Sequence, residues 1–183
     1  MDLHPTTTRY SGTAIALHWL TALLIVAGFT LGLSMVGLPF GRQKLQWYAW
    51  HKWIGITVWL VTCSRLAWRW THSPPPMEPM PHWQRQAAVV THALLYAFLV
   101  VIPLSGWLYS SASGVEVVYL GLIPLPDLVS KDRALADILR NVHLTLNFTL
   151  LALVCIHVVA ALKHHFVDRD AVLARMLPRS RNP

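Results

Sequence analysis

Two histidines, His143 and His157, have the spacing in this chain that most directly suggests chemistry. They lie fourteen positions apart in a stretch, Asn141 to Leu162, that contains no Asp, Glu, Lys or Arg. In a helix, fourteen residues at about 100° each fall about 40° short of four turns, so both imidazoles leave one face about 21 Å apart along the axis. An imidazole in hydrocarbon is costly unless it is paired, hydrated or coordinating something. The spacing therefore predicts two stacked metal centres.

The composition indicates that membrane helices position these histidines. The chain has 183 residues, of which 55% are hydrophobic and only 13% charged, and its mean hydropathy is +0.45. These values are too apolar for a water-soluble domain with an ordinary charged surface. We expect an all-α integral membrane four-helix bundle formed by one domain, residues 1–183. Its four spans are predicted at about 13–37, 46–70, 89–110 and 141–164.

The second predicted span has the weakest hydrophobic signal. Lys52 and Arg65 leave only residues 53–64 uncharged between them, so both cations must extend toward opposite membrane surfaces. The N-terminus has no short apolar core followed by a small-residue cleavage site, and we expect the first span to be retained.

Charge asymmetry predicts the orientation of the bundle. Four spans place both termini and the proline-rich connection after the second span on one side, with nine Lys and Arg residues against six on the other. The positive-inside rule then places both termini in the cytoplasm. The opposite connection, about 111–140, is expected to carry a short amphipathic helix from Lys131 onward.

Because neighbouring spans run in opposite directions, the depth of each histidine follows from its place in its span. His18 and His157 both lie near the cytoplasmic surface, and His51 and His143 both lie near the opposite one. The sequence therefore predicts two facing pairs of imidazoles.

Two facing imidazoles with no Cys, Asp or Glu beside them do not complete the tetrahedral set of structural zinc. They do supply the two axial nitrogens of a b-type haem, and a bundle of apolar helices supplies its slot. A proton relay or hydrogen-bonded structural histidines are the alternatives. Gly28, Gly32 and Gly55 could give a porphyrin clearance or serve helix packing alone.

Other polar residues are expected near the cytoplasmic pair. His92 has no free partner at its depth and is a candidate contact for a quinone or a haem propionate, with a simple interfacial residue as the alternative. His164 lies seven residues after His157, on a similar face, and could deliver protons to a quinone, although solvation at the interface is the alternative for it and for His165. Arg9 and Arg65 could pair with haem propionates, but membrane topology alone would also place arginines there.

Six basic residues on the opposite side could attract a small anion. Ordinary interfacial cations are the alternative interpretation. The six residues are Arg42, Lys44, Lys52, Lys131, Arg133 and Arg140.

Several stretches together resemble the bacterial cytochrome b561 family of di-haem membrane proteins over essentially the whole chain. They include RYSGTAIALHWL, THSPPP, THALLYAFLVVIPLSGW and VHLTLNFTLLALVCIHVVAALKHHF followed by LARMLPR. The resemblance implies that His18 and His157 ligate a cytoplasmic haem, and that His51 and His143 ligate a periplasmic one. It also implies single-electron transfer of the superoxide oxidase type, in which superoxide donates electrons to ubiquinone, so the chain would be an oxidoreductase or an electron carrier.

Other functions stay open at this stage. The main alternative is a cytochrome b subunit that passes electrons between quinone and a partner dehydrogenase or hydrogenase. A histidine-lined proton channel or transporter is a lower-ranked alternative, since Pro103 is the only helix breaker inside a predicted span. The net charge of +7 gathers beside the predicted membrane ends, so we expect lipid and quinone rather than nucleic acid as partners, with a protein partner possible but not required.

Overall fold

The computed structural model describes residues 9–178 of the chain, and these residues form four long helices. The helices are α1 (Gly12–Val36), α2 (Arg42–Thr71), α3 (His82–Ala112) and α4 (Arg133–Lys163). Two short elements follow α4, namely a π-helical turn, η1 (His164–Asp168), and a 3₁₀ turn, η2 (Ala174–Met176).

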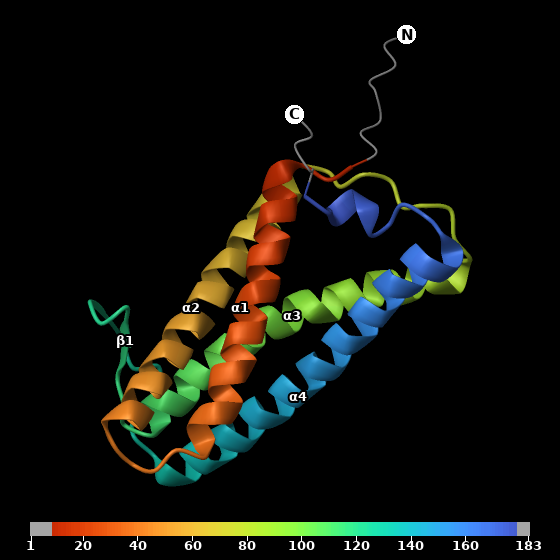
Figure 1. Ribbon diagram of the computed structural model, residues 1–183. Coiled ribbons are helices and arrows are strands. Elements are labelled where there is room, and N and C mark those ends of the chain that lie inside the picture. Colours follow the sequence, from red (N-terminus) through yellow and green to blue (C-terminus); the bar gives the residue numbers. More distant parts are fainter. Residues whose placement is uncertain (1–8, 179–183) are drawn as a thin grey trace.

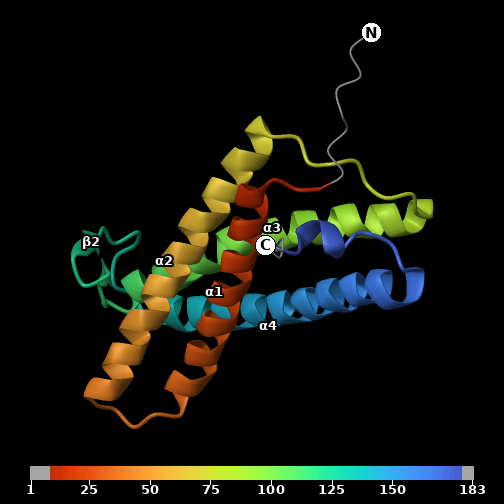
Figure 2. The same cartoon turned by 45° about the horizontal axis from the view of Figure 1, so that its top comes forward.

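The helices pack as two antiparallel pairs, α1 with α2 and α3 with α4, which meet through α2 and α3. Figure 1 shows the proline-rich connection after α2 and the segment after α4 at the same end of the bundle. We call this end, which contains residues 9–11, 72–81 and 164–178, the terminal end. The opposite end contains residues 37–41 and 113–132, and we call it the hairpin end. Figure 2 shows the α1–α2 pair lying across the α3–α4 pair.

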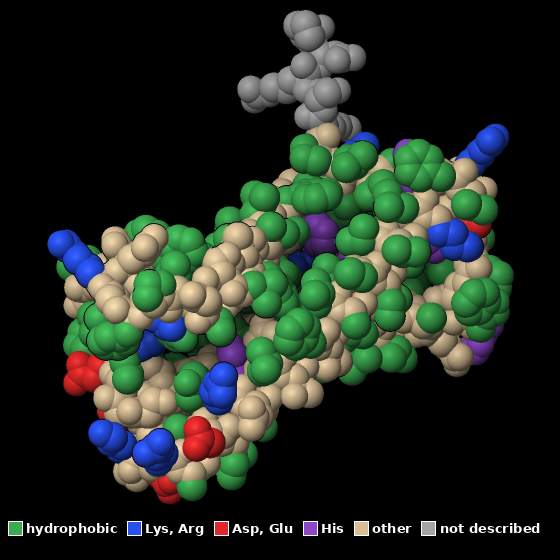
Figure 3. Space-filling view, turned by 60° about the horizontal axis from the view of Figure 1, so that its bottom comes forward, with side chains coloured by type: hydrophobic (Ala, Val, Ile, Leu, Met, Phe, Trp, Pro, Cys, Tyr) green, Lys and Arg blue, Asp and Glu red, His purple; other side chains and the backbone are tan. Residues whose placement is uncertain are grey.

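The surface of the bundle is that of a membrane protein. Three helical segments among the described residues are long and apolar enough to cross a bilayer, namely Gly12–Val36, His82–Ala112 and Arg133–Asp168. Large hydrophobic side chains on these segments are exposed, for example Leu23 and Val26 on α1 and Val159 on α4. Figure 3 shows hydrophobic side chains along the flanks, with charged groups gathered toward the ends. The protein is therefore an all-α integral membrane bundle. Among the four long helices, only α2 is too polar in composition to be recognised as a span by its hydropathy, as the positions of Lys52 and Arg65 predict.

Helix α1 agrees with its predicted span to within one residue, whereas α2, α3 and α4 begin four to eight residues before theirs. Ser11 begins α1 by accepting a hydrogen bond from the Ala14 N–H, and the Asp132 carboxylate does the same for Leu135 at the start of α4. The prediction of a separate amphipathic helix from Lys131 is wrong, because residues from Arg133 onward are the first turns of α4 itself. These turns carry charges and protrude from the apolar segment, so hydropathy alone detects only the part that lies in the membrane.

A short β-hairpin, absent from the sequence-based prediction, lies in the connection between α3 and α4. Strand β1 (Val117–Tyr119) pairs antiparallel with β2 (Ile123–Leu125) through the register Val117↔Leu125 and Tyr119↔Ile123. The turn between them places Leu120 and Gly121 in the left-handed region, at φ 54° and 72°. The hairpin contacts α2, where the Trp53 Nε1–H donates to the Val118 carbonyl at 2.7 Å.

The centre of the bundle is an apolar cluster formed by Val58, Leu99, Ile102 and Leu150, from α2, α3 and α4. Partly buried residues of α1, such as Leu24 and Phe29, pack against it. Burial of this cluster holds the two helix pairs together and fixes the depth at which the histidines of different helices face one another.

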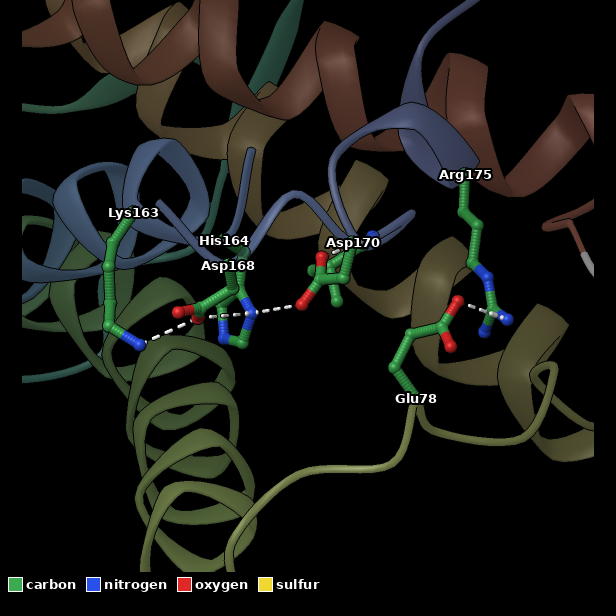
Figure 4. Close-up of polar contacts among 7 residues, drawn as sticks. Glu78, Lys163, His164, Asp168, Asp170 and Arg175 are labelled. Carbon is green, nitrogen blue, oxygen red and sulfur yellow. Dashed lines mark hydrogen bonds and ion pairs between the residues drawn. The ribbon is translucent and has the colours of Figure 1, made fainter. Parts of the chain in front are cut away.

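The segment after α4 closes over the terminal end. Arg175 pairs with Glu78 at 2.5 Å and donates to the Pro76 carbonyl at 2.7 Å, which ties the segment to the proline-rich connection. Figure 4 shows this ion pair beside the polar cluster at the end of α4. The Trp19 Nε1–H donates to the Met176 carbonyl at 2.7 Å, so the same segment also binds α1.

Candidate functional site

At the hairpin end, the structure brings together the predicted pair His51 and His143. Their ring centroids lie 6.3 Å apart and their planes are perpendicular, at 90°. His51 lies on α2 and His143 on α4, so the pair joins two helices that belong to different helix pairs.

A hydrogen bond at Nδ1 of each ring determines which of its two nitrogens carries the hydrogen. The Nδ1 of His51 lies 3.1 Å from the Gly28 carbonyl, and the Nδ1 of His143 lies 2.9 Å from the Ser105 hydroxyl. That hydroxyl donates its own hydrogen to the Ile102 carbonyl at 2.7 Å, so it accepts from His143. A carbonyl can only accept as well, and both Nδ1 atoms therefore carry the hydrogen. Each Nε2 keeps a lone pair, as a metal ligand requires.

Two glycines make room for these rings. A Cβ atom at Gly32 would lie 3.1 Å from Cε1 of His51, and one at Gly106 would lie 3.0 Å from Cε1 of His143. Gly28 serves the pair through its carbonyl, while a Cβ there would lie at an ordinary 3.4 Å from Ile54. The histidine rings, and not only helix packing, thus explain the spacing of Gly28 and Gly32. Gly106 and Ser105 were not predicted as site residues.

A mostly apolar cavity lies at this pair and is lined by residues of all four helices. Besides the two imidazoles, its lining includes the central apolar cluster, the backbone of Gly28 and Gly55, and a polar contribution from Asn147. Gly55 has open space where a Cβ would stand. An apolar slot between facing imidazoles is the environment that a flat, hydrophobic macrocycle requires.

The separation of the rings fits two axial ligands of one iron. An imidazole nitrogen binds iron at about 2 Å and lies about 1 Å from its ring centre, so two axial imidazoles have centroids about 6 Å apart. The pair at the hairpin end, at 6.3 Å, has this separation, and so does the pair at the terminal end, His18 and His157, at 6.2 Å. The residues therefore fit b-type haem at both levels.

The terminal-end pair differs in what contacts its outer nitrogen. The Arg65 guanidinium lies 3.3 Å from Nδ1 of His18 and also stands over the Tyr96 ring, 5.2 Å from its centroid. Because a guanidinium can only donate, Nδ1 of His18 accepts in this arrangement. Iron binding through Nε2 needs the hydrogen on Nδ1, so Arg65 must then release His18 and take another acceptor.

His92 joins the same cluster. Its ring centroid lies 5.3 Å from that of His157, and its side chain is exposed on α3. This separation is shorter than that of two axial ligands, and the His18–His157 pair matches the ligand geometry better. His92 thus lies beside the candidate haem site, as the prediction of a quinone or propionate contact requires.

The remaining predicted residues lie farther from the imidazole pairs or in other interactions. Arg9 donates to the Leu177 carbonyl at 2.8 Å, and therefore holds the segment after α4 in place. His164 is largely buried and contacts two carboxylates, at 2.5 Å from Asp170 and 3.3 Å from Asp168, whereas His165 is exposed (Figure 4). Lys163 pairs with Asp168 at 2.6 Å.

The basic residues of the hairpin end divide into two groups. Lys44 donates to the Leu38 carbonyl at 2.8 Å, just after α1, and Lys52 donates to the Glu116 carbonyl at 3.0 Å. The other four are exposed or partly exposed on α2, α4 and the connection before α4, namely Arg42, Lys131, Arg133 and Arg140.

A helical membrane bundle that presents facing imidazoles across an apolar slot defines a class, the membrane cytochromes with b-type haem. The sequence comparisons lead to the same class: the model of the family described as prokaryotic cytochrome b561 matches residues 9–179. The chain belongs to this family, whose members bind b-type haem and transfer electrons in bacterial membranes.

Individual relatives cover nearly the whole chain. Cytochrome b561 homolog 2 of Escherichia coli (strain K12) is 36% identical, with 98% of this chain and 97% of the relative aligned. Cytochrome b561 homolog 1 of the same organism is 32% identical, with 93% and 98% aligned. A protein of Yersinia pestis named "Probable superoxide oxidase CybB" is 29% identical, with 94% and 98% aligned.

Proposed function

We propose that this protein carries single electrons across the bacterial inner membrane through two b-type haems, taking them from superoxide at the periplasmic side and passing them to ubiquinone. The observation that supports this most strongly is the pair of facing imidazoles at each end of the bundle, with centroids 6.2 and 6.3 Å apart. Bound haem would supply the one-electron chemistry. The name of the Yersinia pestis relative supports the choice of superoxide.

Four histidines would hold the two haems. His51 and His143 would bind the one at the hairpin end, where Gly28 and Ser105 orient their rings. His18 and His157 would bind the one at the terminal end, and Arg65 would exchange its contact with His18 for a haem carboxylate. The excess of Lys and Arg beside the terminal end supports a cytoplasmic position for that end and four membrane crossings.

At the hairpin end, the basic residues would concentrate superoxide. Arg42, Arg133 and Arg140 are exposed, and their positive charges would attract an anion from solution. Each superoxide would lose one electron and leave as dioxygen. Two such events supply the two electrons that reduce one ubiquinone, and the reduction also takes up two protons.

At the terminal end, His164 would move those protons. Its Nδ1–H points to the Asp170 carboxylate at 2.5 Å, so its Nε2 is the atom that can accept and release a proton. The ring lies seven residues after His157, about 10 Å farther along the axis of the helix. His92, beside His157, would contact the quinone itself.

The proposal is tested with the holoprotein in vesicles that contain ubiquinone, with superoxide generated enzymatically outside. We expect rapid reduction of the b-type absorption bands, followed by one ubiquinol for every two superoxide ions consumed, and suppression of both by superoxide dismutase. Failure of superoxide to reduce the haems, while a co-purifying dehydrogenase reduces them, would contradict the proposal and favour the partner-subunit alternative.

A further inference from the structure

The β1–β2 hairpin presents an apolar tip to its surroundings. Residues 117–126 contain no charged side chain, while Glu116 and Asp127 flank them on either side. At the tip, Leu120, Leu122 and Ile123 are 51%, 80% and 54% exposed. Leucines at a turn exposed to water bring no stability to a hairpin, and turns of this kind normally use Asn, Asp and Gly. The exposed apolar side chains of the tip therefore indicate that it lies in an apolar environment.

Hydrogen bonds to α2 define the depth at which the hairpin lies. Lys52 donates to the Glu116 carbonyl, Trp53 donates to the Val118 carbonyl, and Thr57 shares a hydrogen bond of 3.0 Å with the Tyr119 hydroxyl. These contacts fall within about two helical turns of His51, at the level where the charged first turns of α2 give way to its apolar part. Figure 1 shows the hairpin projecting sideways from α2, away from α1 and α4.

The hairpin also packs against α2, the most polar of the four long helices. Among the long helices, α2 is the one too polar to qualify as a span by its composition. Three neighbouring side chains of α2 carry polar groups on the face toward the hairpin. Each of them forms a hydrogen bond with the hairpin or with the residue before it, namely Lys52, Trp53 and Thr57. An unsatisfied polar group on this face would be costly in the membrane.

From these observations we infer that the β1–β2 hairpin lies in the interfacial region of the lipid leaflet at the hairpin end, with Leu120, Leu122 and Ile123 among the lipid acyl chains. The flanking Glu116 and Asp127 remain on the water side. The hairpin thereby anchors the hairpin end at a fixed depth and supplies hydrogen-bond partners to polar side chains of α2.

A cavity between the hairpin and α2 supports the inference that the hairpin lies in lipid. A cavity of about 270 Å³ lies between the hairpin and α2, and its lining is largely apolar, with Tyr48, Trp53 and Val118 among the residues that contribute. Lys52 and Glu116 line the same cavity, and the Lys52 ammonium donates to the Glu116 carbonyl. A lining that is mainly apolar matches the acyl chain of a lipid.

The test measures the depth of the tip in the intact holoprotein. Cys63 and Cys155 are replaced with alanine, and Leu122→Cys is labelled with a nitroxide and studied by electron paramagnetic resonance in vesicles of phosphatidylcholine and phosphatidylglycerol. Collisions with dioxygen, which concentrates in lipid, are compared with collisions with a water-soluble nickel chelate. Ser130→Cys, in the same connection and exposed, is the water-facing control, and Leu33→Cys, exposed on α1, is the lipid-facing control.

We expect the label at position 122 to behave like that at position 33, with a ratio of dioxygen to nickel collisions several-fold higher than at position 130. Equal ratios at positions 122 and 130 would place the tip in water and overturn the inference. A label at 122 that neither reagent reaches would also overturn it, because a second copy or another protein would then cover the tip. The readout needs no electron donor or quinone, so it does not depend on the proposed function.

Discussion

Replacing Ser105 with alanine is expected to weaken haem binding at the hairpin end of the bundle without unfolding the protein. Ser105 is only 5% exposed, and its hydroxyl accepts from His143 at 2.9 Å while donating to Ile102. Alanine fits the same space but offers no acceptor. His143 then keeps a buried N–H without a partner and loses the contact that fixes its ring.

The magnitude follows from the cost of that unpaired donor. A buried donor left without its acceptor costs about 1–3 kcal/mol, which corresponds to roughly 5- to 150-fold in an equilibrium constant. Loss of a partner that orients a metal-binding histidine costs about 10- to 100-fold in affinity by direct comparison. We therefore expect the haem at the hairpin end to bind about 10- to 100-fold more weakly. Its midpoint potential should rise, because a histidine that no longer donates a hydrogen bond is a weaker electron donor to ferric iron.

The assay is a titration of the partly extracted protein with haem, followed by a redox titration of each absorption component. Ser110→Ala is the matched control, because Ser110 lies on the same helix, is 6% exposed and donates to the Val115 carbonyl at 2.6 Å. Its loss should affect stability but neither haem. Ser105→Thr, which retains the hydroxyl, should restore much of the affinity. The reasoning is refuted if Ser105→Ala and Ser110→Ala bind haem equally and have the same midpoint potentials.

Three further predictions concern other parts of the site. Gly106→Ala places a Cβ 3.0 Å from the His143 ring, so the haem bands of the hairpin end should broaden or disappear, whereas Gly12→Ala, with open space, should leave the spectrum unchanged. Asp170→Asn removes the nearer of the two carboxylates that contact His164. It should slow ubiquinol formation, because the orientation of the imidazole is lost, while haem reduction by superoxide stays unchanged. Equal slowing of both steps would contradict this. Arg175→Gln breaks the partly buried ion pair with Glu78. It should lower the free energy of unfolding by about 1–3 kcal/mol, measured by thermal unfolding, and leave the haem spectra normal. The exposed Arg133→Gln is the control, and equal stability of the two variants would show that this ion pair does not hold the segment after α4.

The helices and the pairing of the histidines could be predicted from the sequence because both depend on local patterns. Apolar runs longer than a bilayer's thickness are read directly along the chain, and the antiparallel order of neighbouring spans converts position into depth. This argument correctly pairs His51 with His143 and His18 with His157 as neighbours in space. It fails at the helix ends, since the first turns of α4 and α3 are polar and lie beyond the hydrophobic segment.

The residues that orient the ligands could not be found in the same way. Ser105 and Gly106 contact His143 only because α3 and α4 pack at a particular rotation, which no periodicity in a uniformly apolar helix reveals. The β-hairpin was missed for a different reason. Its turn uses Leu120 in a left-handed conformation, and leucine is not a signal for such a turn. Asp170 meets His164 through the π-helical turn, an irregularity that helical spacing does not predict.

The most direct test of the account counts haems in single histidine variants. The wild-type protein, purified after expression with ample haem, should contain two b-type haems per chain. His143→Ala should lose the one at the hairpin end and His18→Ala the one at the terminal end, each keeping the spectrum of the other, whereas His165→Ala should keep both. A wild-type protein with a single haem, or a His143→Ala variant that still binds two, would contradict the assignment of the two imidazole pairs as axial ligands.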